Sequence, residues 1–212
     1  MIKFENVDLA YNEKKIFAGL SLEIKQGEKI AVAGRSGLGK SSLFSLILGF
    51  VEPTDGNVFF GGVRIDEKTA WQVRRKIAFV DQDVSLGHEK AADWISFVSG
   101  LKANSSADFA ETKVKELMGY FELEHSLLNK NVSDLSGGER QRVAIVLSVL
   151  LARKIFLLDE VTSALDKNLK QKVADYFIGK KEWTVIVISH DSVWVDNACV
   201  KVFDLETGKW KQ

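Results

Sequence analysis

The chain has 212 residues, of which 46% are apolar and 27% charged, a composition typical of a globular protein with a buried core. Its 29 lysine and arginine residues balance 29 aspartate and glutamate residues, so no basic excess predicts a nucleic-acid partner. The single cysteine, Cys199, excludes an internal disulfide. The N-terminus lacks the apolar segment of a signal peptide, and no apolar run approaches the ~20 residues of a membrane-spanning helix. We therefore expect neither a signal peptide nor a membrane span.

Short strands are predicted along the first 80 residues and again in the second half of the chain. They lie at 2–11, 17–24, 29–33, 57–60, 76–80, 155–158 and 184–189. The last two are continuous apolar runs, which is typical of strands covered on both faces in a parallel α/β sheet. The end of the chain, 200–210, predicts a hairpin that turns at Glu206-Thr207-Gly208. The segment 91–130 is predicted to be mostly helical, with an apolar face made of Phe97, Leu101, Val114, Leu117, Met118 and Phe121. The sequence thus predicts an α/β core with a small helical insert.

A glycine-rich loop follows the third predicted strand. Residues 34–41 read GRSGLGKS, which matches G-x-x-x-x-G-K-[ST], and the following SSLFSLILGF predicts a helix. The glycines allow the backbone to approach phosphate closely, and the helix N-terminus favours an anion. Lys40 suits the β- and γ-phosphates and the Ser41 hydroxyl suits Mg²⁺. A chance match is the alternative. The predicted nucleotide contacts are Gly34, Arg35, Ser36, Gly37, Leu38, Gly39, Lys40, Ser41 and Ser42.

Two carboxylates end the apolar strand at 155–158. A buried acid costs free energy unless a cation or water meets it, and alternation along a strand sends neighbouring side chains to different sides. Asp159 and Glu160 are therefore predicted to do different work. Asp159 suits the coordination of an Mg²⁺ held by Ser41, and Glu160 suits the base that polarises a water for attack on the γ-phosphate. The alternative is a strand end whose acids only cap a turn.

Three further residues lie at strand ends, where the active sites of open α/β sheets gather. His190 follows the strand 184–189 and suits a hydrogen bond to the γ-phosphate or to the attacking water. Gln82 follows the strand 76–80 and suits two tasks, coordination of Mg²⁺ through its carbonyl oxygen and contact with the attacking water. Tyr11 ends the first strand and suits stacking on adenine. For each of them the alternative is an ordinary surface or packing residue.

A second glycine-rich stretch, DLSGGERQR at 134–142, precedes the apolar run VAIVLSVLL. Paired glycines are poor helix formers, so their place at the start of a predicted helix indicates a role other than stability. Such a helix start presents a cluster of N–H groups to an anion.

Taken in order, the phosphate loop, DLSGGERQR, IFLLDE, SALD and the strand-end histidine resemble the motifs of the ABC-type ATPases, over nearly the whole chain. The resemblance identifies 34–41 as Walker A, 135–139 as the signature, 155–159 as Walker B and 163–166 as the D-loop. It makes Tyr11 the A-loop aromatic residue, Gln82 the Q-loop residue, Glu160 the catalytic glutamate and His190 the H-loop residue.

The resemblance also implies a fold and an assembly. The fold is α/β, with a P-loop NTPase core whose sheet is mostly parallel, an N-terminal antiparallel β-subdomain and a small α-helical subdomain. In a single domain, 1–82 and 135–212 form the core with its β-subdomain, and about 83–134 forms the helical subdomain. Two copies are expected to dimerise head to tail around two ATP molecules. Each nucleotide then lies between Walker A of one copy and Ser136, Gly137, Gly138 and Glu139 of the other.

Three residues depart from the family pattern. Asp81 stands where many relatives have proline, which leaves the backbone before Gln82 less constrained. Glu139 replaces the commoner glutamine and brings a negative charge to an anion site unless its side chain turns aside. Leu147 stands where arginine is usual, which puts one surface or D-loop contact in doubt. None of the three removes a catalytic group, so an active ATPase is expected.

The resemblance implies the ATP-hydrolysing subunit of an ABC transporter at the cytoplasmic face of the membrane, working with a separate membrane-spanning subunit. The compact insert and the run LLDEVTSALDKNLKQKV look similar to exporter ATPases assigned to metal or iron export. The alternatives are an ABC ATPase of a non-transport membrane complex, as in cell division or lipoprotein release, and a soluble DNA-repair ABC ATPase. The DNA-repair class carries long coiled-coil or DNA-binding insertions, which this sequence lacks.

Overall fold

The computed structural model describes residues 1–12, 14–84, 87–105 and 107–211 and contains two sheets. The first is antiparallel, with the order β2-β1-β4-β5. Its strands are β1 (Ile2–Tyr11), β2 (Lys14–Ile24), β4 (Asp55–Phe60) and β5 (Val63–Arg64). The predicted N-terminal antiparallel part of the fold is confirmed, although β2 and β4 begin earlier than expected and β5 was not predicted.

The second sheet has the order β10-β9-β3-β8-β7-β6, and its described strands pair in parallel except for the β9–β10 hairpin. Its strands are β3 (Lys29–Ala33), β6 (Ile77–Val80), β7 (Ile155–Asp159), β8 (Thr184–Ile188), β9 (Lys201–Asp204) and β10 (Lys209–Trp210). β3, β7 and β8 are buried along their whole length. The mostly parallel core sheet and the terminal hairpin are therefore confirmed.

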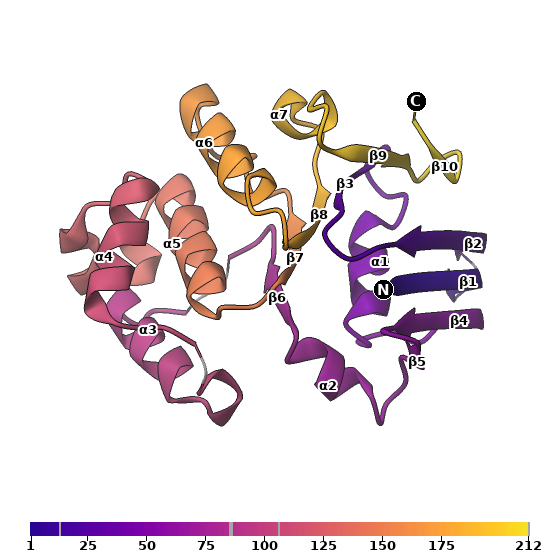
Figure 1. The fold of residues 1–212 in the computed structure, drawn as a ribbon, viewed down its shortest axis with the longest axis horizontal. Helices are drawn as coiled ribbons and strands as arrows, with labels where there is room; N and C mark the ends of the chain where they lie inside the picture. The colour runs from indigo at the N-terminus through magenta and orange to yellow at the C-terminus, as the bar shows by residue number, and fades with distance from the viewer. Residues whose placement is uncertain (13, 85–86, 106, 212) are drawn as a thin grey trace.

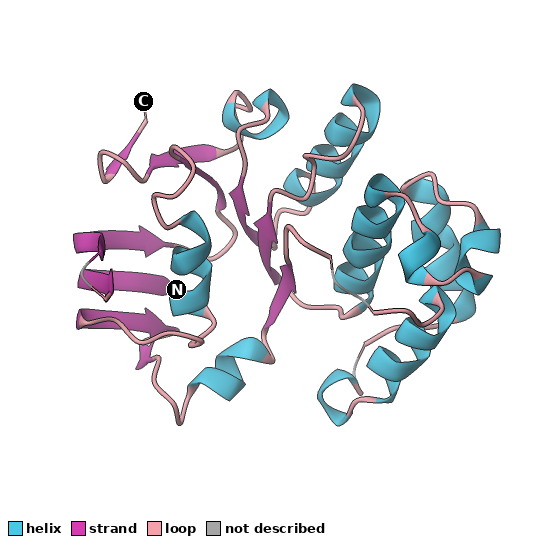
Figure 2. Cartoon of the chain, turned by 180° about the vertical axis from the view of Figure 1, so that it is seen from behind, coloured by secondary structure: helices cyan, strands magenta, loops and turns pink. Residues whose placement is uncertain are grey.

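The helices cover both faces of this sheet (Figure 1, Figure 2). They are α1 (Lys40–Ile47), α2 (Ala70–Arg74), α3 (Ala91–Gly100), α4 (Glu111–Tyr120), α5 (Gly137–Leu150), α6 (Lys167–Ile178) and α7 (Ser192–Val195). Short 3-10 helices span Lys102–Asn104, His125–Asn129 and Val132–Asp134. α1 lies between the two sheets, whereas α3, α4 and α5 gather on the far side of the parallel sheet (Figure 1).

Alternate side chains of the parallel strands enter two different cores. Ile30, Leu157 and Ile186 join the cluster around α1, between the sheets. Ala31, Phe156 and Val187 join the cluster beneath α4, α5 and α6. Burial on both faces explains why these strands read as continuous apolar runs rather than alternating ones.

The prediction for the helical insert is confirmed in its helices and only partly in its apolar face. The segment 91–130 consists of α3, α4 and short 3-10 helices, so it is mostly helical, as predicted. The predicted apolar face is confirmed only at Val114, Leu117, Met118 and Phe121, which are buried. Phe97 and Leu101 were wrongly assigned to it, since their side chains are 60% and 42% exposed. α3 instead turns Ala91 into the core. The Trp94 ring, whose centroid lies 5.7 Å from that of Phe97 in an edge-to-face arrangement, is the only aromatic contact described for Phe97.

Candidate functional site

The predicted phosphate loop connects β3 to α1, and its backbone conformation depends on glycine. Gly37 has φ 81° and Gly39 has φ 90°, values that disfavour other residues. A Cβ atom added to Gly39 would lie 2.2 Å from Cγ2 of Ile16, a residue of β2. The antiparallel sheet therefore packs against the loop where α1 begins, and only glycine fits this position.

Lys40, at the start of α1, lies within the loop. Its Nζ donates to the carbonyl oxygens of Gly34 at 2.8 Å and Arg35 at 3.1 Å, and its side chain is 8% exposed. The ammonium group is thus held by the same loop that is predicted to bind the phosphates. Ser36 is exposed, whereas Leu38 and Ser42 are half-buried.

A hydrogen bond joins the phosphate loop to the end of β7, as the prediction for the two groups requires. The Ser41 hydroxyl donates to Oδ2 of Asp159 at 2.9 Å. Burial raises the pKa of the Asp159 carboxyl, and the charges of Asp81 and Glu160 raise it further, against the opposing effects of Ser41 and Lys40. Asp81 therefore acts on this site electrostatically, an effect that the sequence does not indicate, since there Asp81 shows only as a departure from the usual proline.

Glu160 and His190 line one cavity of about 180 Å³, together with Ser163 and Lys170. Glu160 has φ 46°, an unfavourable conformation for a residue with a side chain, and its N–H donates to the Ile188 carbonyl at 2.9 Å. Strand β8 thus fixes the backbone of Glu160 at a strained position, of the kind that occurs at functional sites. A larger cavity of about 790 Å³ lies beyond His190, between α7 and the terminal hairpin, and is not lined by any other predicted site residue.

A polar network behind His190 was not predicted. Asp191 accepts hydrogen bonds from Thr162 at 2.6 Å and Lys170 at 2.5 Å. Burial opposes the charged form of Asp191, but these hydrogen bonds outweigh it and lower the pKa of this carboxyl. The Trp194 ring N–H also donates to the Thr162 hydroxyl at 3.3 Å. Because its hydrogen-bonded partners lie 21 to 32 residues apart and form no local pattern, the sequence alone gives no signal for this network.

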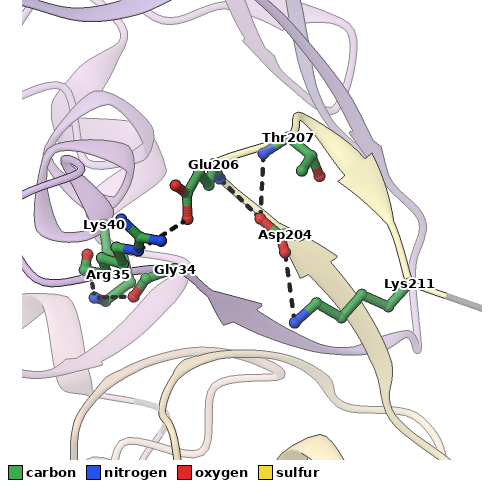
Figure 3. Close-up of polar contacts among 7 residues, drawn as sticks. All are labelled: Gly34, Arg35, Lys40, Asp204, Glu206, Thr207 and Lys211. Carbon is green, nitrogen blue, oxygen red and sulfur yellow. Dashed lines mark hydrogen bonds and ion pairs between the residues drawn. The ribbon is translucent and has the colours of Figure 1, made fainter.

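The terminal hairpin packs against the phosphate loop (Figure 3). The Leu205 N–H donates to the Ala33 carbonyl at 2.9 Å, directly before Gly34. Nε of Arg35 lies 3.6 Å from Oε2 of Glu206, and the Arg35 side chain is 83% exposed. Asp204 holds the turn by accepting the N–H groups of Glu206 at 2.9 Å and Thr207 at 3.2 Å. A carboxylate, that of Glu206, therefore stands beside the loop.

The second glycine-rich stretch forms the start of α5, with Ser136 as its N-cap. Gly138 meets the D-loop region of its own chain, since a Cβ there would lie 3.0 Å from the Ala164 carbonyl oxygen. A Cβ on Gly137 would meet no atom within 4 Å. Arg142 holds this helix start, because its guanidinium donates to the carbonyls of Phe121 at 3.0 Å and Glu122 at 2.8 Å. Leu147 is buried in the core.

Two predicted residues are not brought to the Ser41–Asp159 pair by any described contact. Gln82 is exposed, its N–H donates to Oδ1 of Asp81 at 2.8 Å, and it lines a cavity of about 560 Å³ with Arg140 and Ser163. Tyr11 is 42% exposed and pairs with Lys14 at the end of the hairpin whose Ile16 contacts Gly39.

Comparison with known proteins agrees with this geometry. A family model described as ABC transporter matches residues 17–163. The ATP-dependent lipid A-core flippase of Neisseria meningitidis serogroup A is 34% identical over 223 residues, covering 98% of this chain and 34% of the flippase. The chain thus spans about a third of the length of the curated relatives it matches.

Two solved structures have the same fold along the whole chain. A bacterial Atm1-family ABC exporter with ATP bound aligns with a TM-score of 0.84 and 26% identity, over 38% of that chain. The dimeric ATP-binding cassette MJ0796, bound to ADP and Pi in a post-hydrolysis state, aligns with a TM-score of 0.81 and 26% identity, over 97% of that chain. None of the helices in the described ranges combines the length and hydropathy that crossing a bilayer requires. The chain belongs to the ABC transporter family and has the ATP-binding fold of its ATPase domains.

Proposed function

We propose that the chain hydrolyses ATP between two head-to-tail copies and thereby drives a membrane-spanning partner. The observation that carries this proposal is the 2.9 Å hydrogen bond between Ser41 and Asp159, with the strained Glu160 directly after it. The loop that holds phosphate and the strand end that bears the carboxylates thus meet at one point of the fold.

The oxygen atoms of Ser41 and Asp159 fit Mg²⁺, a cation that prefers oxygen ligands and keeps part of its shell as water and phosphate. Within the described residues, no group of three or more His, Cys, Asp or Glu side chains is placed to hold a metal by itself. A site completed by phosphate oxygens matches this arrangement. Gln82 is proposed as a further ligand, because it follows β6, the strand that pairs with β7. When bound, Mg²⁺ would offset the negative charge of the phosphates.

Glu160 is proposed as the base that orients and polarises the attacking water. Its cavity also contains His190, which would donate a hydrogen bond to the γ-phosphate. Lys40 would exchange the loop carbonyls for phosphate oxygens, and Tyr11, exposed at the edge of the antiparallel sheet, would stack on adenine. Each side chain has a single task, and catalysis comes from their alignment.

The α5 N-terminus is proposed to contact the nucleotide held by a second copy. Ser136 and Gly137 are exposed, and the helix start favours phosphate. The N–H groups of Ser136 and Glu139 bond to each other's side chains, so the N–H groups of Gly137 and Gly138 are the ones proposed to face the phosphate. The core, 1–82 and 135–212, would hold ATP, while the helical subdomain, about 83–134, would carry movement to the partner. The dimeric solved relative supports this assembly.

The surface proposed for the membrane-spanning partner lies on α3. Phe97 is 60% exposed, and it lines a cavity of about 240 Å³ with Trp94, Glu89 and Asp93. Exposed aromatic side chains in a concave site are typical of a protein interface. Contact with such a partner would place the chain at the cytoplasmic face of the membrane. The similarity to exporters supports transport out of the cytoplasm, with metal or iron as the substrate class to test first.

The proposed reaction is tested with Glu160→Gln, which keeps the size of the side chain and removes its basicity. We expect ATP binding to persist, turnover to fall at least ~100-fold, and an ATP-dependent dimer to accumulate in size-exclusion chromatography. Glu67→Gln, which changes an exposed carboxylate far from the motifs, is the matched control and should keep full activity. Wild-type turnover by Glu160→Gln would refute the assigned base.

A further inference from the structure

The short connection between α5 and β7 contains a half-buried arginine that joins three other segments. Nη1 of Arg153 donates to the carbonyl of Arg74, at the end of α2, at 3.0 Å, and also to the carbonyl of Ile77, where β6 begins. Nη2 of Arg153 donates to Oδ1 of Asn104 at 3.0 Å. The first two acceptors belong to the core, and the third belongs to the helical insert.

Asn104 is itself fixed within the insert. It is 5% exposed, its Nδ2 donates to the Val98 carbonyl at 2.8 Å, and its N–H donates to the Leu101 carbonyl at 2.8 Å. These bonds attach the Asn104 amide to the last turn of α3, the helix that carries Phe97. Its oxygen is left to face Arg153, so the amide connects α3 to the core through one side chain.

The positive charge of Arg153 depends on these three hydrogen-bond acceptors. No carboxylate in the described part of the chain forms an ion pair with Arg153, and burial lowers the pKa of its guanidinium. The half-buried cation is therefore stabilised by three neutral oxygens, whose loss would leave part of it poorly solvated. A planar guanidinium reaches all three in one orientation, which a lysine ammonium would not do.

We infer that Arg153 and Asn104 form a joint that fixes the orientation of the helical insert on the core, with Arg153 as a positioning residue for hydrolysis. This inference rests on the proposed function. The segments that meet at the joint lead to Gln82 through β6, to Glu160 through β7, to Ser136 through α5 and to the partner surface through α3. The hydrogen bonds described for Arg153 reach Arg74, Ile77 and Asn104 and no residue of the proposed nucleotide site, so the joint acts on alignment and not on nucleotide affinity.

Asn104→Ala tests the contact between the insert and the core by itself. It removes the acceptor that the insert offers to Arg153 and leaves the two hydrogen bonds of Arg153 to the core in place. We expect ATP turnover to fall about three- to tenfold while the ATP affinity of the monomer stays unchanged. Arg153→Gln should give a similar loss, and the double variant should be no worse than either single variant. Lys154→Gln, the exposed neighbour of Arg153, is the matched control and should keep full turnover.

The orientation of the insert on the core can also be measured as a distance, independently of ATP turnover. Spin labels at Ser96→Cys in α3 and Glu67→Cys in the core, in a Cys199→Ser background, should give one narrow distance distribution, which Asn104→Ala broadens. An unchanged distribution with full turnover would overturn the joint, as would losses that multiply in the double variant. If the wild-type chain has no ATPase activity, the proposed function fails, and the distance distributions alone decide the joint.

Discussion

Ser136 and Glu139 cap the start of α5 reciprocally. The Glu139 N–H donates to the Ser136 hydroxyl oxygen at 3.2 Å, and the Ser136 N–H donates to Oε2 of Glu139 at 2.8 Å. Hydrogen bonding of its carboxylate with Ser136 lowers the pKa of Glu139. The acidic residue that replaces the family's usual glutamine thus turns back to its own helix start, as its tolerance at an anion site requires.

This geometry gives Ser136 a structural task beside its proposed catalytic one, and two substitutions separate them. Ser136→Ala should lower the free energy of unfolding by about 1 kcal/mol because the cap is lost. Ser136→Asp keeps a good helix cap and should retain stability, but its carboxylate would repel the phosphate of the nucleotide that the second copy holds. Both variants should lose turnover, while ATP binding by the monomer persists. Thermal unfolding and ATPase assays measure the two effects, and normal turnover by Ser136→Asp would exclude the contact in trans.

Asp159 should make the ligand-free protein less stable as the pH rises. Folding raises the pKa of the Asp159 carboxyl, so the folded state binds the proton more tightly than the unfolded state. The protonated carboxyl's contribution to the free energy of unfolding is therefore fully present below the unfolded pKa, and it is lost as the pH rises through the folded pKa. Asp159→Asn keeps the Ser41 contact without the charge. We expect Asp159→Asn to raise Tm at pH 7 by a few degrees, with a smaller difference near pH 4.

The same substitution should remove the magnesium-dependent part of nucleotide stabilisation. Unfolding curves of the wild type and of Asp159→Asn with ATP, with and without Mg²⁺, measure this. A lower Tm for Asp159→Asn at neutral pH without ligand would contradict the destabilising effect of the buried charge.

Local chemistry explains which parts of this molecule could be predicted from the sequence. The loop at Gly34–Ser41 and the helix start at Ser136 depend on glycines, caps and adjacent strands, all of which are visible within ten residues. The buried strands were evident because both of their faces are covered. Alternation along the strand predicts that Asp159 and Glu160 face different sides. In the structure Asp159 accepts a hydrogen bond from Ser41, whereas Glu160 lines a cavity together with His190.

Long-range polar contacts could not be predicted in this way. Asp191 meets Thr162 and Lys170 only after the chain has folded, and Arg153 meets Asn104 across 49 residues. For Phe97, in contrast, the sequence predicts burial that the structure does not show. Its helical spacing predicted burial, but an interface residue has the same spacing as a core residue, and only the packing of α3 distinguishes them.

Gly39 should tolerate no side chain, for two reasons that can be measured separately. Gly39→Ala imposes φ 90° on alanine and brings its Cβ against Ile16, so we expect a loss of about 2 to 3 kcal/mol in the free energy of unfolding, together with impaired ATP binding. Gly37→Ala has a similar φ but meets no atom within 4 Å, so it should lose about 1 kcal/mol. Ile16→Ala in the Gly39→Ala background should restore part of the difference. Equal losses in the two glycine variants would show that packing against β2 does not matter.

Glu206 should reduce the affinity for ATP through charge alone. The Arg35–Glu206 pair spans 3.6 Å and is largely exposed, so its removal should leave Tm within about one degree of the wild type. Glu206→Gln removes a negative charge beside the phosphate loop and frees Arg35 to face phosphate. We expect about two- to fivefold tighter ATP binding at low ionic strength, fading at about 0.5 M salt because the groups are exposed.

The double variant Arg35→Gln with Glu206→Gln identifies the source of this gain. If the released guanidinium provides it, the double variant should bind ATP no more tightly than the wild type. If the gain comes only from removing the carboxylate, it should persist without Arg35. Glu67→Gln removes one negative charge elsewhere and controls for net charge. Tighter binding that is unaffected by salt would contradict the electrostatic account, because an exposed charge beside the loop acts through solvent that salt screens.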